Sequence, residues 1–223
     1  MATKRRIEQA RFAEREKVRA RSSRDFHDDS GNKITKISLY TGLLRQKLAA
    51  STEVSPMLDK IEENLKSLSH GMRDFIWALD PEKDQLQETI MRLHDFGQDL
   101  FADSGVAFRL EKQILDEQLR LDLNLRRQLL LIFKEAMNNA LKYAKASEVL
   151  LQVHQSETHL AFALRDNGLG FDYEQLSRVN GLNNMQQRVA EMGAEIAIES
   201  VPSIGTHIKV QIPIAIINHP NGS

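Results

Sequence analysis

The feature that most constrains the fold is a run of apolar residues between positions 58 and 79, spaced alternately three and four apart. Such spacing keeps a narrow seam on one side of an α-helix, which is typical of helices that pack in bundles. Asp80-Pro81 ends the pattern because proline cannot continue a helix, and Ser55 and Pro56 suit the N-cap and first helical position. The seam residues are Leu58, Ile61, Leu65, Leu68, Met72, Phe75 and Leu79.

A second helical pattern, without proline, covers about residues 4–50, and residues 49–56 are predicted to form a turn. Two antiparallel helices with one seam each cannot bury those seams alone, whereas two such hairpins can pair into a four-helix bundle. We therefore predict a homodimer through about residues 20–80. The alternative is a hairpin that packs on the second half of its own chain. The stripe on the first helix comprises Phe26, Lys33, Ile37, Thr41, Leu44 and Leu48, with Ile34 close by.

After Pro81 the periodicity changes to a mixture of helices and strands. Helices that cover one face of a mixed sheet form an α+β sandwich, which is the fold class we predict for this half. Helices are expected at 86–105, 122–145 and 181–193, and strands at 106–112, 148–155, 159–168 and on both sides of a turn within 194–214. The divisions that follow are 1–23, 24–81, 82–214 and a disordered tail at 215–223.

Composition excludes several classes of protein. The chain is 41% hydrophobic and 27% charged, with no cysteine and a net charge of −1, so disulfides are excluded and nothing indicates nucleic-acid binding. No apolar run approaches the ~20 residues that span a bilayer. We therefore expect a cytoplasmic chain.

Charge is concentrated at the start, where residues 1–24 hold nine Lys and Arg against three Glu. Such a segment suits a solvated helix, a nucleic-acid arm or a stretch just inside a membrane. Because it begins in helical register, we expect a piece of a longer protein, with an upstream membrane span or sensor domain as a hypothesis.

Polar residues with a chemical use gather in three stretches of the second half. In "KEAMNNALKYA" (134–144), Glu135 and Asn139 share a helix face, with Lys142 and Tyr143 on an adjoining patch. Carboxylate, carboxamide and ammonium groups on one surface suit a Mg²⁺-phosphate ligand, because Mg²⁺ takes only one or two protein oxygens. The alternative is a helix that displays these groups to solvent.

The other two stretches combine glycine with polar groups. In "RDNGLGFD" (165–172), Asp166 can accept a hydrogen bond from an exocyclic amine, and the glycines permit close approach of the backbone. "GLNNM" (181–185) begins a predicted helix, where backbone amides favour phosphate, and "GTHIKVQIP" (205–213) enters the last strand.

These motifs, in this order, resemble the ATP-binding domain shared by gyrase, MutL and the sensor histidine kinases. The resemblance implies that Asn139 ligates Mg²⁺, that Glu135 supports the metal or its water, that Lys142 contacts phosphate and that Tyr143 packs near the nucleotide. Asn138 is the other candidate ligand. Asp166 is implied to bind the adenine amine. The remaining implied nucleotide-binding residues are Gly168, Gly170, Gly181, Leu182, Met185, Gly205 and Thr206, with Thr206 assisting Asp166.

The stretch "FHDDSGNKITKIS" (26–38) resembles the phosphoacceptor box of sensor kinases related to nitrate/nitrite sensors and membrane thermosensor kinases, and "FIWALDP" (75–81) resembles their interdomain junction. On that resemblance His27 is the nucleophile, and Asp28 fixes its tautomer and accepts its proton. Asn32 stands where relatives commonly carry the longer Gln, thought to orient water for dephosphorylating the partner. The alternative, which applies if the ATP-site motifs are left aside, is that His27 has a purely structural role.

The resemblance implies a two-component histidine kinase that autophosphorylates from ATP and passes phosphate to an aspartate of a response regulator with a helix-turn-helix output domain. The divisions become a signalling helix or coiled coil (1–23), a dimerisation and phosphotransfer domain (24–81), a catalytic ATP-binding domain (82–214) and the tail. Two alternatives remain: a gyrase-like ATPase or serine kinase of the same fold, and a non-catalytic dimeric scaffold.

Overall fold

The computed structural model divides into two compact units, Met1–Lys83 and Asp84–Ser223, which are described separately. The division falls two residues beyond the boundary that Pro81 predicts. His27 and Asp28 lie outside the described residues. The described residues are 14, 18–19, 32–47, 55–172 and 180–218.

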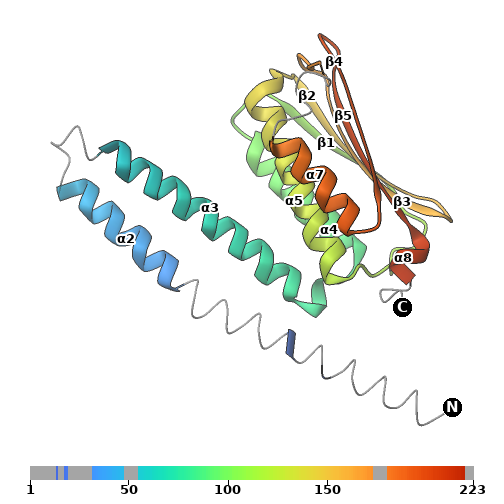
Figure 1. Cartoon of the computed structure of the whole chain (residues 1–223), viewed down its shortest axis with the longest axis horizontal. Coiled ribbons are helices and arrows are strands. Elements are labelled where there is room, and N and C mark those ends of the chain that lie inside the picture. Colours follow the sequence, from blue (N-terminus) through green and yellow to red (C-terminus); the bar gives the residue numbers. More distant parts are fainter. Residues whose placement is uncertain (1–13, 15–17, 20–31, 48–54, 173–179, 219–223) are drawn as a thin grey trace. The chain divides into compact units, whose positions relative to one another are not determined.

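The first unit contains a helical hairpin, α2 (Asn32–Lys47) and α3 (Ser55–Leu79), as predicted (Figure 1). The helix α3 begins at Ser55 itself and stops before Asp80, and a short 3₁₀ turn, η2, follows at Pro81–Lys83. The pattern of three and four thus forms one helix of 25 residues.

An ion-pair fork joins the two helices of the hairpin. Arg45 of α2 donates to both carboxylate oxygens of Glu62, each at 3.0 Å, and to Asp59 Oδ1 at 2.6 Å. Hydrogen bonds to Glu62 and then Asp59 raise the pKa of the Arg45 guanidinium further above its ordinary value, so it stays charged. The fork holds the end of α2 against the start of α3.

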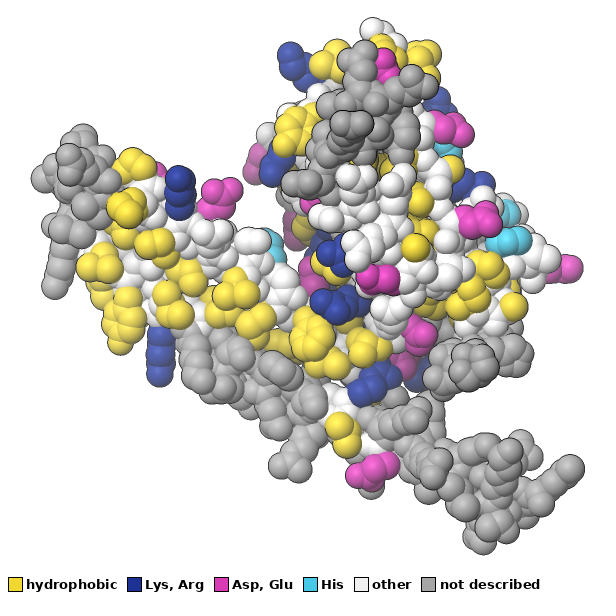
Figure 2. All heavy atoms as spheres, in the orientation of Figure 1, with side chains coloured by type: hydrophobic (Ala, Val, Ile, Leu, Met, Phe, Trp, Pro, Cys, Tyr) yellow, Lys and Arg dark blue, Asp and Glu magenta, His cyan; other side chains and the backbone are white. Residues whose placement is uncertain are grey.

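Much of the apolar surface of the hairpin stays exposed within one chain. Ile34 and Leu58 are buried, whereas Ile61 and Leu68 of the predicted seam remain 45% and 55% exposed. Hydrophobic side chains gather over α2 and α3 in Figure 2. The exposed members are Ile37, Leu39, Tyr40, Leu43, Leu44, Met57, Ile61 and Leu68.

The second unit is a five-stranded sheet with helices on one face, the predicted α+β sandwich (Figure 1). Strand order is β1-β2-β3-β5-β4, in which β1 and β2 are parallel and the other pairs antiparallel. The elements are α4 (Leu86–Phe101), β1 (Ala107–Gln113), α5 (Leu123–Asn139), β2 (Glu148–Gln155), β3 (His159–Asp166), α7 (Asn180–Glu191), β4 (Glu195–Val201) and β5 (Gly205–Pro213).

The core lies between the helices and the inward face of the central strands. Every second residue is buried in β2 and β3, and in β5 from Ile208 onward, which is the alternation that the sequence predicts for a sheet covered on one face. Asp122 caps α5, because its carboxylate accepts from the Leu125 N–H at 2.8 Å. Further along α5, Phe133 packs on Phe162 of β3, with ring centroids 5.7 Å apart. This packing fixes α5 over the middle of the sheet.

Several elements end away from their predicted bounds, and three of these differences change the type of structure or the start of a loop. The helix predicted at 86–105 stops at Phe101, and Gly105 adopts φ +74° in the turn that follows. The helix predicted at 122–145 leaves α-geometry after Asn139 and continues as a π-helical turn, η3 (Ala140–Ala144). The prediction of a disordered tail from residue 215 is wrong for its first four residues. Ile214–Asn218 form the short helix α8, in which Ile217 is buried.

Within the described parts of the chain, no helix combines the length and hydropathy that crossing a bilayer requires.

Candidate active site

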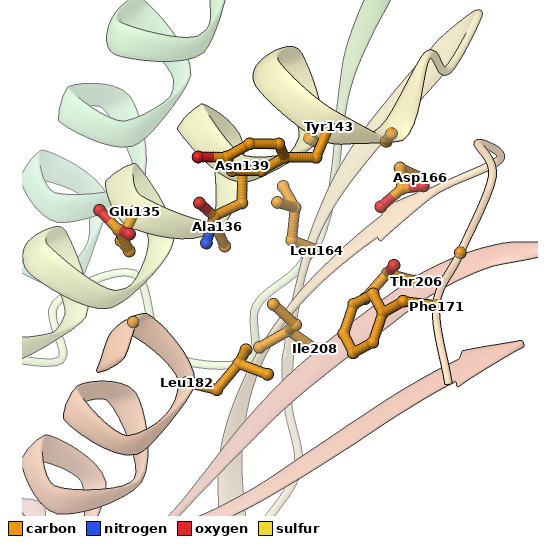
Figure 3. Close-up of a pocket in the computed structure, with 14 residues that line it drawn as sticks. Glu135, Ala136, Asn139, Tyr143, Leu164, Asp166, Phe171, Leu182, Thr206 and Ile208 are labelled. Carbon is orange, nitrogen blue, oxygen red and sulfur yellow. The ribbon is translucent and has the colours of Figure 1, made fainter. Parts of the chain in front are cut away.

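A cavity of about 440 Å³ opens between the end of α5 and the strands β3 and β5. Figure 3 shows Glu135 and Asn139 on one side, Asp166 and Thr206 on the other, and Leu164 and Ile208 between them. The cavity is therefore polar at both ends and apolar in the middle. Its lining residues are Glu135, Ala136, Asn139, Ala140, Tyr143, Ala144, Leu164, Asp166, Gly170, Phe171, Gly181, Leu182, Thr206 and Ile208.

The helix α5 supplies the first polar end. Glu135 and Asn139 are one helical turn apart, so both reach the cavity, as their spacing predicts. Asn138 does not line it, because its Nδ2 donates to the Lys134 carbonyl of the same helix at 2.8 Å. Between the two candidate asparagines, the geometry therefore favours Asn139.

The π-helical turn shapes the next part of the wall. Such turns shift the register of the residues that follow, and they are frequent at functional sites. Tyr143 lines the cavity while 70% of its surface remains exposed, and Ala140 and Ala144 complete this side. Lys142 is exposed and is not among the lining residues.

The second polar end comes from two paired strands. Asp166 ends β3 directly opposite Thr206 of β5, and its side chain is buried with 7% exposure. Asp166 Oδ1 accepts from the Gly168 N–H at 2.9 Å, and the described residues offer no partner to Oδ2. The carboxylate is thus held in place with one oxygen still able to accept a hydrogen bond.

Glycine is required where the backbones around Asp166 approach one another. A Cβ on Gly205, whose φ is +126°, would collide with the Asp166 carbonyl, and a Cβ on Gly168 would collide with the Ala144 carbonyl. The same Ala144 carbonyl accepts from the Leu169 N–H at 2.7 Å. These contacts bring the loop after β3, the π-turn and β5 together around the cavity.

The structure brings most of the predicted residues to this cavity. The predicted residues that line it are Glu135, Asn139, Tyr143, Asp166, Gly170, Gly181, Leu182 and Thr206. Gly168 and Gly205 support its wall, Met185 is buried in α7, and Lys142 lies outside. Asn32 begins α2 in the other unit.

Sequence reasoning missed the apolar lining. Ala136, Ala140 and Ala144 recur every four residues beside Asn139, and Leu164 and Ile208 stand two residues from Asp166 and Thr206 on the same strand faces. Helical and strand periodicity around the polar residues could have found these five. Phe171 carries no comparable signal.

This donor set fits a nucleotide with a divalent cation. Apolar walls beside a buried carboxylate suit a flat ring that carries an amine, while a carboxylate and a carboxamide at the other end suit Mg²⁺, which completes its shell with water and phosphate. In the described residues, no group of three or more His, Asp or Glu side chains converges on a metal position.

Two family models match the chain in consecutive segments. Residues 18–84 match the model described as histidine kinase, and residues 124–216 match the one described as histidine kinase-, DNA gyrase B-, and HSP90-like ATPase.

The chain belongs to the histidine kinases.

The kinase core is also similar to individual proteins. It is 27% identical over 220 residues to sensor protein VraS of Staphylococcus haemolyticus strain JCSC1435 and to that of Staphylococcus aureus strain COL. Each match covers 89% of this chain and 56% of the relative, so the chain spans little more than half the length of these relatives.

Solved structures share its fold. The histidine kinase domain of the Erythrobacter litoralis EL346 blue-light activated histidine kinase superposes with a TM-score of 0.52 at 13% identity, covering 83% of this chain and 96% of that chain. A second structure of that kinase gives 0.55 at 16% identity, covering 72% of this chain and 52% of that chain. A helical hairpin followed by an ATPase-type domain is therefore the fold of this chain.

Proposed function

We propose that this kinase core uses Mg²⁺-ATP to phosphorylate His27 and passes the phosphate to an aspartate of a response regulator. The observation that carries the proposal is the single cavity with Asp166 and Thr206 at one end and Glu135 and Asn139 at the other. That arrangement matches the two chemically different ends of ATP.

The adenine binds at the Asp166 end. Asp166 Oδ1 is held by the Gly168 N–H, so Oδ2 accepts a hydrogen bond from the exocyclic amine, and the Thr206 hydroxyl assists beside it. Leu164 and Ile208 contact the ring, whose burial against apolar side chains contributes to binding. Gly170 and Gly181 let the backbone approach the nucleotide.

The triphosphate binds toward α5. The Asn139 side-chain oxygen ligates Mg²⁺, and Glu135 holds the metal or one of its waters. Held by these two residues, Mg²⁺ would supply positive charge beside the phosphate oxygens. Lys142 lies outside the cavity lining, so its contact with phosphate requires its long side chain to reach over the rim. The Leu182–Met185 turn of α7 closes the remaining side.

His27 is the phosphoacceptor, supported by the histidine kinase match over residues 18–84. One imidazole nitrogen forms a bond to the γ-phosphorus, the bond from that phosphorus to the β,γ-bridging oxygen breaks, and ADP leaves. Asp28 accepts the proton from the other nitrogen as the phosphohistidine forms. In a separate reaction, Asn32 orients a water molecule that hydrolyses the phosphoaspartate of the regulator and releases inorganic phosphate.

The partners follow from the hairpin and the family. A second copy covers the exposed apolar face of α2 and α3, giving a four-helix bundle. The response regulator carries a helix-turn-helix output domain. The proposal also includes an upstream sensor or membrane segment in the full-length protein, on the resemblance of this chain to membrane-associated sensor kinases.

Incubation with ATP labelled at the γ-phosphate tests the proposal. The expected label is acid-labile and base-stable in the wild type and absent from His27→Gln. Label that persists in His27→Gln, or ATP turnover with no labelled protein, would indicate a serine kinase or a gyrase-like ATPase instead. Absence of ATP binding would indicate a scaffold.

A further inference from the structure

Ser200 connects two segments that line the cavity, although Ser200 itself is not a lining residue. It lies in β4, next to β5 in the sheet. Its hydroxyl oxygen accepts from the Phe171 N–H at 2.9 Å, lies 3.1 Å from Thr206 Oγ1 and donates to the Gly205 carbonyl at 3.3 Å.

The three contacts use the whole hydrogen-bonding capacity of one hydroxyl. A serine hydroxyl has one proton and two acceptor lone pairs. One lone pair takes the Phe171 N–H, the proton goes to the Gly205 carbonyl, and the second lone pair takes the proton of Thr206. No other atom of Ser200 can replace this oxygen, so its removal breaks all three contacts together.

Each contact holds a part of the cavity wall. Phe171 follows the glycine loop after β3, and its ring lies across from Leu182 at the cavity (Figure 3). Thr206 lies opposite Asp166 in the strand register, and Gly205 packs on the Asp166 backbone. Ser200 therefore joins the loop after β3 to the start of β5 at the Asp166 end of the cavity.

We propose that Ser200 is a positioning residue for nucleotide binding, which fixes the Phe171 ring and the Thr206 hydroxyl against the adenine. This inference rests on the proposed function, because it assigns the adenine to the Asp166 end. Ser200 lies at the end of the cavity away from Glu135 and Asn139. Its loss therefore weakens binding of the base and leaves the phosphate end in place.

The test compares Ser200→Ala with wild type and with Glu199→Ala, in the full chain. Glu199 neighbours Ser200 on β4, but its side chain points to the other face and is 76% exposed. Calorimetric titration with Mg²⁺-ATP gives Kd, and initial rates of autophosphorylation against ATP concentration give KM and the maximal rate. For Ser200→Ala we expect Kd and KM to rise about tenfold, the effect of losing well-formed hydrogen bonds, with the maximal rate within about twofold.

A KM equal to that of wild type would overturn the inference. A merely structural role predicts that result, together with a lower maximal rate and a lower Tm. If Ser200→Ala does not fold, Ser200→Cys replaces it in the same measurements, since the thiol is close to the hydroxyl in size but is a weak hydrogen-bonding group. A KM equal to that of wild type in Ser200→Cys overturns the inference. A wild type that binds no ATP would overturn the proposed function as well, whereas normal wild-type binding with unchanged variants overturns only the role of Ser200.

Discussion

We predict that breaking the buried ion pair between Asp84 and Arg126 lowers the free energy of unfolding of the second unit by several kcal/mol. Arg126 lies on α5 with no exposed side-chain surface, and its Nη2 is 2.5 Å from Asp84 Oδ1. Asp84 is 9% exposed and also meets Arg120 at 3.2 Å, while its carbonyl accepts from the Leu121 N–H. Asp84→Ala removes the carboxylate and leaves that backbone contact.

The size of the effect follows from burial. Removing one member of a buried ion pair costs about 3–5 kcal/mol, because the other charge stays desolvated without that counter-charge. Arg120 provides the matched control on the same carboxylate: its side chain is 59% exposed, so Arg120→Ala is expected to cost about 0.2–1 kcal/mol. At roughly 4 °C per kcal/mol, Asp84→Ala lowers the Tm of this unit by about 12–20 °C.

Urea and thermal unfolding followed by circular dichroism measure both variants. The double variant Asp84→Ala/Arg126→Met should recover most of the lost free energy, because it also removes the buried charge. The reasoning is refuted if Asp84→Ala and Arg120→Ala cost the same, or if the double variant is less stable than Asp84→Ala alone.

Three further predictions concern the cavity and the hairpin. Gly205→Ala places a Cβ against the Asp166 carbonyl at a φ of +126°, so we expect a loss of about 1–3 kcal/mol in unfolding experiments and weaker ATP binding in titrations. Asn139→Asp should raise the KM for Mg²⁺-ATP at least about tenfold while the chain stays dimeric, whereas Asn138→Asp, whose side chain bonds its own helix, should change KM less than about twofold. Equal effects in the two would contradict the metal assignment. Leu68→Glu adds a charge to the exposed apolar face of the hairpin, in which Leu68 itself is 55% exposed, so light scattering should report monomers; a stable dimer would place the interface elsewhere.

Local signals in the sequence were sufficient for most of the fold. The alternation of three and four predicted α3, and Asp80-Pro81 gave its end. The strand at 148–155 has the predicted bounds, because apolar residues recur at every second position (Val149, Leu151 and Val153) between turn-forming segments. The polar cavity residues were predictable because their order and spacing resemble a known ATP-binding domain.

Other features depend on contacts between segments far apart in the sequence. Nothing local indicates that Arg126 is buried, since its partner Asp84 lies 42 positions earlier. The π-turn follows a sequence that reads as continuous helix, and only packing against the loop after β3 shows its use. Ser200 was missed for the same reason: its partners come from a loop and a neighbouring strand.

Mapping the phosphate by mass spectrometry, under neutral to alkaline conditions that preserve phosphohistidine, tests the central claim most directly. After a short incubation with Mg²⁺-ATP well below the wild-type KM, we expect a single phosphate on the peptide that contains His27 in wild type, and a yield about tenfold lower in Asn139→Asp, because the cavity must bind ATP before His27 can react. Phosphate on a serine or threonine, or an unchanged yield at His27 in Asn139→Asp, would contradict it.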